Sequence, residues 1–547
     1  MWSTTKGIRR PKDRAPNQVW DRRSLPNARP AATDRRGAIR YRAGLPVTVH
    51  AAGKTFRGRL RDLSETGMLL AKASVPSTAG KVRLDFQVPE GVLPESLDAK
   101  YSLTATIVRR RVEDQALGFH FDRPLSDVLR PSVWRRLRIV GSAAIALGLI
   151  AIFWLKQESA FLAYFDPHLF AYGTAVILYL LSRLAFASFY RPQERGNSDY
   201  APTVSLIIPC YNEEDSIERT ILHALDQRYP EDRYEVIVAD DGSTDRSQEV
   251  LEILARRFAQ LKHVTLTKNV GKRRAMAAAY GLSSGEIVAF CDSDSFLQPD
   301  AIEKLVIPFE DAKIGAVCGH CEVHNKWTNI YTKMQSVRYF LAFRIMKAAE
   351  SVFDSVTCLS GPLAGYRRDE IDPVIDRWIN QRFLGVEATF GDDRSLTNFI
   401  LPTTKIVYQS TAITSTIVPS TFEQLLRQQM RWKRSWIRES VRASRFMWRK
   451  QPFMATSFYL GFILPMIAPL VALRALLYIP VRFGGSPDGY FFGILCISGI
   501  FSAVYLLDRR SRLWTYGIAF SYFYLFVLLW QLPLATATYW VKGWGTR

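Results

Sequence analysis

The stretch Gln428-Gln-Met-Arg-Trp432 marks the point at which one kind of chain gives way to another. It lies within LLRQQMRWKRSWIRES, a segment dense in Arg and Trp that comes just before the apolar final third of the sequence. Gln428, Arg431 and Trp432 are spaced i, i+3, i+4, which places their side chains on one face of a helix. The stretch therefore predicts a helix at the interface between a soluble domain and a membrane region, with a core helix as the alternative.

Three apolar regions reach the length that a membrane span requires. They are Leu137–Leu155, Leu169–Tyr190 and Met454–Val541, and the last is broken at Arg482–Gly489 and at Asp508–Arg512. The 48% hydrophobic content of the 547 residues is thus very unevenly distributed, which argues against a single globular core. The sequence predicts a multi-pass integral membrane protein.

The net charge of +21 gathers at the N-terminus and beside the apolar regions. The first 44 residues hold 12 Lys and Arg against three Asp and contain no apolar run, which predicts a disordered basic tail over residues 1–33 and no secretory signal. The bias of basic residues toward the cytosolic side accounts for the remaining charge, so no nucleic-acid partner is expected. The same bias predicts an inner (plasma) membrane protein with its soluble domains in the cytosol.

The end of the chain does not give a unique topology. Residues 513–541 are long for one span and short for two, so one span, two spans and a re-entrant segment stay open.

Residues 34–130 consist of short β-like runs, such as LPVTVH and VRLDFQV, separated by Gly, Pro and charged turns. This pattern predicts a small β-barrel. Residues 131–192 follow as two transmembrane helices. From 201 to 418 strands alternate with helices, as in VSLIIP and YEVIVAD, which predicts a doubly wound α/β sheet. The segment 419–453 carries the interface helices, and 454–547 forms the C-terminal membrane region.

The predicted barrel carries two motifs that together suit a guanine nucleotide. Arg36 and Arg40 are one short step apart and can grip phosphates or the Hoogsteen edge of guanine, while Asp62, Ser64 and Gly67 follow on a turn. This RxxxR and DxSxxG pair resembles the PilZ domain, a cyclic di-GMP receptor. The resemblance implies that these five residues line a cyclic di-GMP site and that the nucleotide acts as an activator. The alternatives are a barrel with solvated Arg residues and a PilZ domain that no longer binds.

Polar residues follow successive strands of the predicted sheet. Because ligands bind at the carboxyl ends of parallel strands, we expect these side chains to gather at one edge. Two carboxylates two residues apart at a strand end can share a hard divalent cation, which takes its remaining ligands from a diphosphate. The residues concerned are Tyr211 and Glu213, Asp240 and Asp241, Lys272, and Asp292 and Asp294.

This set of motifs resembles the family 2 inverting glycosyltransferases of GT-A fold. The resemblance implies that Tyr211, Glu213, Asp240 and Asp241 surround the donor nucleoside and that Lys272 lies near the nucleotide. It also implies that Asp292 and Asp294 hold Mg²⁺ or Mn²⁺ on the diphosphate of a UDP-sugar.

Asp392 and Asp393 stand in the motif GDDR. An inverting transfer needs one base that removes the proton of the acceptor hydroxyl. In the resembled family the last acid of this motif is the base, which favours Asp393, with Asp392 as the second choice. A solvated helix N-cap is the alternative for the pair.

The resemblance narrows over residues 131–547 to the hyaluronan synthases, with the rhizobial chitin-oligosaccharide synthases close behind. It implies that Gln428 and Arg431 contact the diphosphate and that Trp432 stacks on the acceptor sugar. The motif Ser360-Gly361-Pro362 would also contact the acceptor. The PilZ-like barrel departs from ordinary hyaluronan synthases and leaves the product open.

Taken together, the sequence predicts a processive β-glycosyltransferase that polymerises UDP-sugars into an exopolysaccharide and moves it across the membrane. The predicted donors are UDP-GlcNAc and, as a further candidate, UDP-GlcA; the other partners are the growing polysaccharide, cyclic di-GMP and the lipid membrane. Hyaluronan or a related GlcNAc-containing polymer is the leading product. A chitin-like or other β-glucan chain, and an inactive transporter or sensor, are the alternatives.

Overall fold

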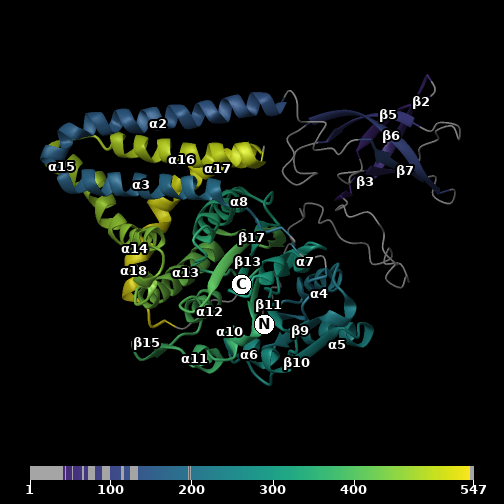
Figure 1. The fold of residues 1–547 in the computed structure, drawn as a ribbon. Helices are drawn as coiled ribbons and strands as arrows, with labels where there is room; N and C mark the ends of the chain where they lie inside the picture. Colours follow the sequence, from purple (N-terminus) through teal and green to yellow (C-terminus); the bar gives the residue numbers. More distant parts are fainter. Residues whose placement is uncertain are drawn as a thin grey trace, which may run out of the picture. The chain divides into compact units, whose positions relative to one another are not determined.

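The computed structural model describes residues 41–42, 45–51, 53–63, 67–71, 81–88, 99–111, 116–122, 133–194, 196, 199–509 and 511–541. The predicted basic tail and the terminal WGTR lie outside these residues. The chain divides into an N-terminal unit, residues 1–88 and 99–129, and a larger unit that holds the rest. Figure 1 shows the elements of each unit.

The N-terminal unit is a closed β-barrel. Its order is β1-β3-β2-β5-β6-β7-β4, and pairing of β3 with β4 closes six of the strands on themselves. Along β2 every second side chain is buried, as Val47 and Val49 are, which is the period expected when one face meets a core. The strands are β1 Tyr41–Arg42, β2 Pro46–Ala51, β3 Lys54–Leu63, β4 Gly67–Ala71, β5 Lys81–Val88, β6 Ala99–Arg111 and β7 Ala116–Phe121.

The larger unit is built around an eight-stranded sheet of order β10-β9-β8-β11-β14-β13-β17-β12. The first four of these strands are mutually parallel, whereas β14 runs antiparallel to both of its neighbours. The strands are β8 Val204–Cys210, β9 Tyr234–Asp240, β10 Leu261–Thr265, β11 Ile287–Phe290, β12 Ser295–Leu297, β13 Ile314–Val323, β14 Ala364–Arg367 and β17 Lys405–Thr416. The predicted α/β class is confirmed, with the refinement that the sheet is mixed.

Helices cover both faces of this sheet. Strand β8 is buried throughout, and its side chains alternate between two cores: Ile207 joins the core under α6, whereas Leu206 and Ile208 join the core under α4 and α5. This explains the unbroken apolar run of the strand, because both of its faces are covered. The helices named here are α4 Ile217–Leu225, α5 Ser247–Arg257, α6 Lys272–Leu282, α7 Ala301–Val306, α11 Ile375–Ile379 and α12 Asp392–Ile400.

Two long helical segments join this sheet to the apolar helices. The first runs from α8 Ile330–Phe340 through the π-helical turn η4 Leu341–Lys347 into α9 Ala348–Ser351. The second is α13 Phe422–Ala443, which contains the stretch Gln428–Trp432. Helix α8 packs on α17, and α13 packs on α18. The second lies within residues 419–453, the segment expected to carry interface helices.

Among the described residues, three helices are long and apolar enough to cross a membrane: Pro167–Phe189 (α3), Pro452–Phe483 (α14, η6 and α15) and Asp488–Arg509 (α16). Helix α2, Val133–Phe165, has a shorter apolar stretch, Gly141–Gln157. Large apolar side chains face outward on these helices, including Phe153 on α2 and Leu470 on α14, which are 66% and 67% exposed. Such exposure fits a lipid environment.

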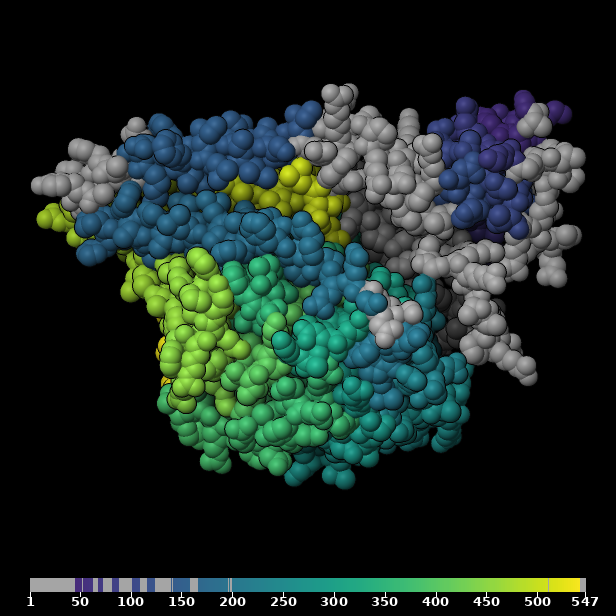
Figure 2. All heavy atoms as spheres, viewed as in Figure 1, coloured from purple at the N-terminus to yellow at the C-terminus, as the bar shows by residue number. Residues whose placement is uncertain are grey.

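The last apolar stretch is a bent pair. Residues 512–528, from η7 through α17 to η8, meet α18, Gln531–Ala537, at 45°. The bend falls in the region for which the sequence left one span, two spans and a re-entrant segment open, and a broken span or a re-entrant loop fits it. Figure 2 shows α3, in blue, lying on the green surface of the same unit, where it packs on α9 and η4.

Candidate active site

The predicted site residues of the sheet gather at one edge. Strands β8, β9 and β11 are parallel neighbours, and they end at Cys210, Asp240 and Phe290. Tyr211 and Glu213 follow the first strand, Asp241 follows the second, and Asp292 and Asp294 follow the third. This is the edge at which α/β sheets bind ligands.

Asp240 and Asp241 differ in what they contact. Asp240 is fully buried; one carboxylate oxygen accepts a hydrogen bond from the Ser243 N–H (3.2 Å), and Oδ2 has no hydrogen-bond partner among the described residues. Asp241 accepts the N–H groups of Val270 and Gly271 at 2.8 and 2.9 Å. Burial raises the pKa of Asp241, and these two N–H groups oppose the rise. Asp240 therefore keeps an open acceptor, whereas Asp241 fixes the loop before α6.

The side chain of Glu213 is turned toward its own loop. Its Oε2 accepts from the Ser216 hydroxyl at 2.7 Å, and its backbone N–H donates to Ser247 Oγ at 2.9 Å. Tyr211 lies beside it and is partly exposed. Asn212, between them, has a φ of +54° and accepts the Thr244 N–H at 2.8 Å. The turn after β8 is thereby tied to the turn after β9.

Lys272, the first residue of α6, forms an ion pair with Asp292. Burial works to lower the pKa of the Lys272 ammonium, but the carboxylate of Asp292 outweighs this and the pKa lies above its ordinary value. Gly361 lies against the same carboxylate, since a Cβ at this position would come 2.6 Å from Asp292 Oδ2. Asp294 accepts from the Thr416 hydroxyl at 3.1 Å. Asp292 and Asp294 are thus held by different partners.

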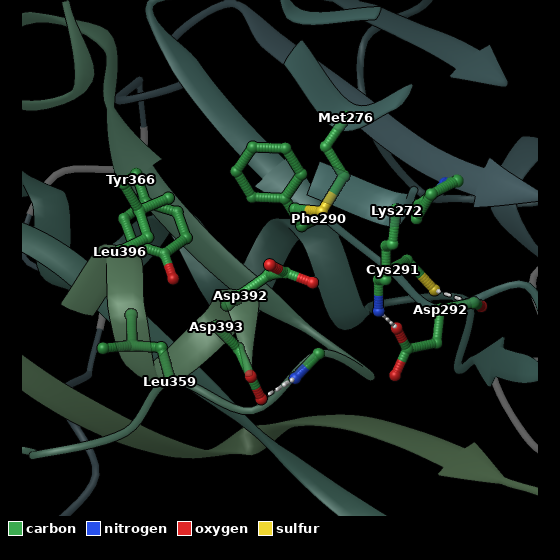
Figure 3. Close-up of a pocket in the computed structure, with 13 residues that line it drawn as sticks. Lys272, Met276, Phe290, Cys291, Asp292, Leu359, Tyr366, Asp392, Asp393 and Leu396 are labelled. Carbon is green, nitrogen blue, oxygen red and sulfur yellow. Dashed lines mark hydrogen bonds and ion pairs between the residues drawn. The ribbon is translucent and has the colours of Figure 1, made fainter. Parts of the chain in front are cut away.

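A pocket lies between this edge and α12 (Figure 3). Its floor is apolar and includes Met276, Phe290, Leu359 and Leu396; Lys272, Asp292 and Asp393 supply the charges. Asp393 Oδ2 accepts the Gly361 N–H at 3.2 Å. Burial raises the pKa of Asp393 despite the opposing effect of Lys272. A carboxylate with a raised pKa in a partly apolar pocket suits a general base.

Asp392 lines the same pocket but is anchored by its carboxylate on the other side. Its Oδ1 accepts from Arg273 Nε at 2.7 Å, and these two side chains are only 3% and 5% exposed. The predicted pair therefore divides, with Asp392 held by a buried cation and Asp393 facing Gly361.

The acceptor motif and the stretch on α13 come from other elements. Ser360 Oγ is 2.8 Å from Lys347 Nζ, which also donates to the carbonyl of Cys358. On α13, Gln428 Oε1 is buried with no hydrogen-bond partner among the described residues. The Arg338 guanidinium lies over the Trp432 ring at 5.3 Å. Pro362 and Arg431 lie beside these residues in the chain, in the motif before β14 and on α13.

Sequence reasoning missed four side chains that hold these groups in place: Arg273, Arg338, Lys347 and Glu439. Arg273 directly follows Lys272, and Glu439 lies in the segment LLRQQMRWKRSWIRES, but the motifs give neither residue a role. A charged residue at a position that the helical period assigns to the apolar face of an amphipathic helix would have indicated them.

Most of the predicted cyclic di-GMP site cannot be placed. Arg36, Arg40 and Ser64 lie outside the described residues. Asp62 lies on β3 with its backbone opposite Leu69, and Gly67 begins β4 opposite His120. A Cβ on Gly67 would come 2.4 Å from the carbonyl oxygen of Phe119, so close strand approach requires glycine there.

Comparisons with known proteins decide the family. Residues 205–374 match the family model described as Glycosyl transferase family 2, and residues 34–135 match that of the PilZ domain. A hyaluronan synthase of Streptococcus pyogenes serotype M3 is 37% identical over 292 residues, which cover 51% of this chain and 69% of the relative. The chain belongs to the family 2 glycosyltransferases.

A rhizobial relative agrees with this membership. An N-acetylglucosaminyltransferase of Rhizobium meliloti is 37% identical over 257 residues, covering 46% of this chain and 60% of the relative. A solved mannosyltransferase of Pyrobaculum calidifontis aligns over 70% of this chain and 99% of its own with 22% identity and a TM-score of 0.47. This family 2 glycosyltransferase is thus a hexosyltransferase of the polysaccharide synthase type, and its N-terminal barrel is a PilZ domain.

Proposed function

We propose that this family 2 glycosyltransferase is a processive inverting synthase that polymerises UDP-sugars into hyaluronan or a related GlcNAc-containing polymer. The proposal adds that the enzyme passes the product through its own apolar helices and that cyclic di-GMP on the PilZ domain activates it. The catalytic domain faces the cytosol, where UDP-sugars are made available. The similarity to a hyaluronan synthase and to an N-acetylglucosaminyltransferase supports this choice of donor sugars.

The observation that carries the proposal is the pocket that Asp393 shares with Lys272 and Asp292, in which the neighbouring Asp392 is paired with Arg273. In an inverting transfer the base removes the proton of the acceptor hydroxyl while that oxygen attacks the anomeric carbon of the donor. The bond from this carbon to the diphosphate breaks, UDP leaves with the bonding electrons, and the proton stays on Asp393. Attack from the opposite face converts an α-linked donor into a β-linked product.

The donor end of the site is assigned to the strand edge. Asp240 Oδ2, which has no hydrogen-bond partner among the described residues, is suited to accept a hydrogen bond from the uracil or ribose of UDP. Tyr211 and Glu213 border the same edge. Asp241 acts on the nucleoside indirectly through the loop that it holds.

Asp292 and Asp294 fit a divalent cation, since two carboxylates on one turn offer the hard oxygen ligands that Mg²⁺ and Mn²⁺ prefer. When bound, such an ion neutralises charge on the departing diphosphate. Lys272 pairs with Asp292 in this structure and is in position to carry positive charge to the same diphosphate.

The acceptor end is assigned to α13 and to the loop before β14. Trp432 offers a ring face for the terminal sugar; Arg431 precedes it directly and Gln428 lies one turn back on α13, both proposed for the diphosphate. Gly361, between Ser360 and Pro362, lines the pocket, and its N–H donates to Asp393.

A direct test supplies the purified full-length protein with UDP-GlcNAc alone, UDP-GlcA alone and both together. We expect polymer only with both donors and complete digestion of it by hyaluronidase. Polymer from UDP-GlcNAc alone that chitinase digests would replace hyaluronan by the chitin-like product that the rhizobial relative suggests. Absence of UDP release with every donor would contradict the enzymatic assignment and leave a transporter or sensor.

A further inference from the structure

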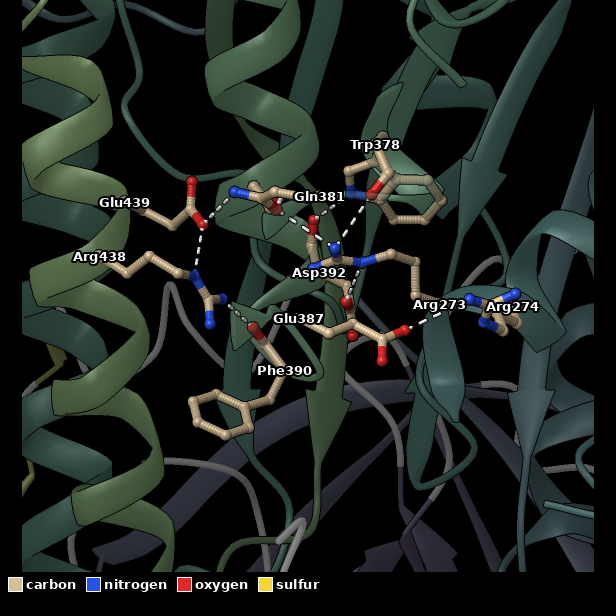
Figure 4. A network of polar contacts seen from close by, with 10 residues as sticks. Arg273, Arg274, Trp378, Gln381, Glu387, Phe390, Asp392, Arg438 and Glu439 are labelled. Carbon is tan, nitrogen blue, oxygen red and sulfur yellow. Dashed lines mark hydrogen bonds and ion pairs between the residues drawn. The ribbon is translucent and has the colours of Figure 1, made fainter. Parts of the chain in front are cut away.

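A network of buried side chains lies behind the pocket and connects α6, α12 and α13 (Figure 4). It includes two cations, Arg273 and Arg438, and two anions, Asp392 and Glu439. All four are at most 7% exposed. Its neutral members are Trp378 and Gln381 at the end of α11, and Ser395 and Asn398 on α12. None of these side chains takes a direct part in the transfer proposed for the pocket. The network meets the pocket only at the turn that carries Asp392 and Asp393.

One end of the network holds the turn that carries the base. Arg273 Nε donates to Asp392 Oδ1 at 2.7 Å, and Arg273 Nη1 donates to the carbonyl of Trp378 at 3.0 Å. The indole N–H of Trp378 donates to the Asp392 carbonyl at 3.2 Å. Both the side chain and the backbone of Asp392 are therefore fixed. Its neighbour Asp393 is left to face the pocket.

The other end of the network belongs to α13. Gln381 connects the two ends, because its Oε1 accepts from Arg273 Nη1 at 3.2 Å and its Nε2 donates to Glu439 Oε1 at 2.8 Å. Glu439 also accepts from Arg438 Nε at 2.8 Å and from Asn398 Nδ2 at 3.2 Å. Glu439, which is completely buried, thus receives donors from three directions.

Helix α13 also touches the base-bearing turn directly. Arg438 Nη2 donates to the carbonyl of Phe390. Gly391 has a φ of +77°, and a Cβ there would come 1.7 Å from Ser435 Oγ. The turn Phe390–Asp393 is thus pressed between α6 and the half of α13 that follows Trp432.

Burying these four charged groups costs free energy, so the network is stable only when its side chains keep their mutual positions. Buried charges are stable only where each is paired and its remaining hydrogen bonds are satisfied, and removing one partner leaves an uncompensated charge. Two cations and two anions balance here. A shift of α13 by even one bond length would break several of these contacts together.

We propose that Glu439 is a positioning residue for the base: through Gln381, Arg273 and Asp392 it sets the place of Asp393 relative to the helix that carries Gln428, Arg431 and Trp432. The inference rests on the proposed function, in which Asp393 is the base and these three residues meet the diphosphate and the acceptor. Misplacement of a reacting group by about 1 Å costs on the order of 100-fold in rate. Glu439 thereby acts on kcat although it touches no substrate.

The test compares three variants of the full-length protein. Glu439→Gln keeps the shape of this side chain and removes its charge. Gln381→Met removes the hydrogen bonds that join Arg273 to Glu439 but leaves the Glu439–Arg438 pair. Glu423→Gln makes the same chemical change in the first turn of α13, where Glu423 is exposed and pairs with Arg427. Each is assayed for UDP release with UDP-GlcNAc and UDP-GlcA, with rates normalised to UDP-binding sites so that unfolded protein does not count.

We expect Glu439→Gln and Gln381→Met each to lower kcat by about 10- to 100-fold, with the donor KM and the UDP affinity changed by no more than about twofold. Glu423→Gln should match the unaltered enzyme. Because the two residues act as one unit, the kcat of the double variant should be no lower than the kcat of the less active single variant. Normal kcat per binding site in both single variants, or losses that multiply, would overturn the proposal.

The variant Asp393→Asn separates this inference from the function beneath it. An inactive Asp393→Asn protein with a fully active Glu439→Gln protein would refute only the positioning role. An active Asp393→Asn protein would refute the base assignment itself, whatever the other variants do.

Discussion

At the scale of single residues, the first turn of α12 gives two adjacent carboxylates different surroundings. Asp392 is paired with the Arg273 guanidinium, whereas Asp393 accepts the Gly361 N–H and has a pKa raised by burial. An acid that a permanent cation neutralises is a poor proton acceptor. The resemblance of the motif already favoured Asp393 over Asp392 as the base, and these surroundings are consistent with that prediction.

This difference predicts unequal effects of the same substitution. Asp393→Asn removes the base, so we expect kcat to fall by about 100- to 10,000-fold with UDP affinity unchanged. Asp392→Asn leaves the base in place but leaves Arg273 without its carboxylate, so thermal stability should fall as well as activity. Rates of UDP release and melting temperatures measure the two outcomes. Equal loss of kcat with no loss of stability in both proteins would contradict the division of roles.

The residue scale also marks the limit of sequence reasoning. The motifs at strand ends were recognisable because parallel strands bring their carboxyl ends to one edge whatever the helices between them do. The partners of these residues were not, because Arg273 and Asp392 are 119 positions apart. No local period connects them, and only the packing of α6 against α12 does.

At the scale of elements, the contact between the turn Phe390–Asp393 and α13 requires glycine at position 391. Gly391 combines a left-handed φ with a Cβ position inside Ser435. We expect Gly391→Ala to cost about 2–5 kcal/mol of stability and to abolish most of the activity, as measured by melting temperature and UDP release.

Gly385 provides the matched control, since its φ is +82° and nothing lies within 4 Å of a Cβ there. Gly385→Ala should cost only the backbone strain, about 1–2 kcal/mol. Similar losses in both variants would show that the contact with Ser435 is unimportant.

A second element-scale prediction concerns the end of α16. His320 on β13 is fully buried between the Tyr408 hydroxyl at 2.7 Å and Arg509 at 3.1 Å. Burial lowers the pKa of His320 to about 4, with Arg344 and Arg509 adding to the effect and Glu322 opposing it. The folded protein therefore holds the neutral ring, while the unfolded chain binds a proton below its ordinary value of 6.5. Stability is full above pH 6.5 and is lost as the pH falls toward 4.

The expected loss is on the order of 3 kcal/mol at pH 4 relative to pH 7 for this group. Melting temperatures of the detergent-solubilised protein across this range measure it. His320→Gln should flatten the dependence between pH 4 and 6.5, and an equally steep dependence in that variant would assign it to other groups.

The elements themselves were largely predictable, with one informative exception. Strands β8, β9, β11 and β13 were legible as apolar runs, and the interface helices as amphipathic ones. The antiparallel strand β14, Ala364–Arg367, was not, because four residues carry too little pattern to be read as a strand or given a direction. Yet its antiparallel direction places its first residue, Ala364, opposite Phe290 at the end of β11, and so brings the preceding loop of Ser360 and Gly361 to that edge.

At the scale of the whole molecule, the apolar helices and the PilZ domain concern properties that the glycosyltransferase domain alone does not determine. The sequence placed the breaks near Arg482–Gly489 and Asp508–Arg512, and the helices end and begin there because charged and glycine-containing segments interrupt the apolar runs. Orientation in the membrane and the route of the polymer depend on lipid and product, which sequence patterns describe only indirectly.

The regulatory prediction belongs to this scale. The double variant Arg36→Ala with Arg40→Ala should lose binding of cyclic di-GMP and the stimulation of UDP release that it causes, because two guanidiniums supply the charge-assisted hydrogen bonds to the nucleotide. Basal turnover without cyclic di-GMP should match that of the unaltered protein. Nucleotide binding by calorimetry and turnover in parallel measure the two effects, and unchanged affinity would refute the assignment of these residues.

The buried network also has a consequence for how the enzyme is made. Arg273 meets its carboxylate 119 residues later in the chain, and Gln381 meets Glu439, which lies 58 residues after Gln381 itself. At about 5–20 residues per second of synthesis, the first interval alone lasts roughly 6–24 seconds. Until α13 has been synthesised, the turn Phe390–Asp393 lacks its contacts with Arg438 and Ser435. The buried network is therefore completed late in synthesis, well after the strands of the sheet that precede it in the chain.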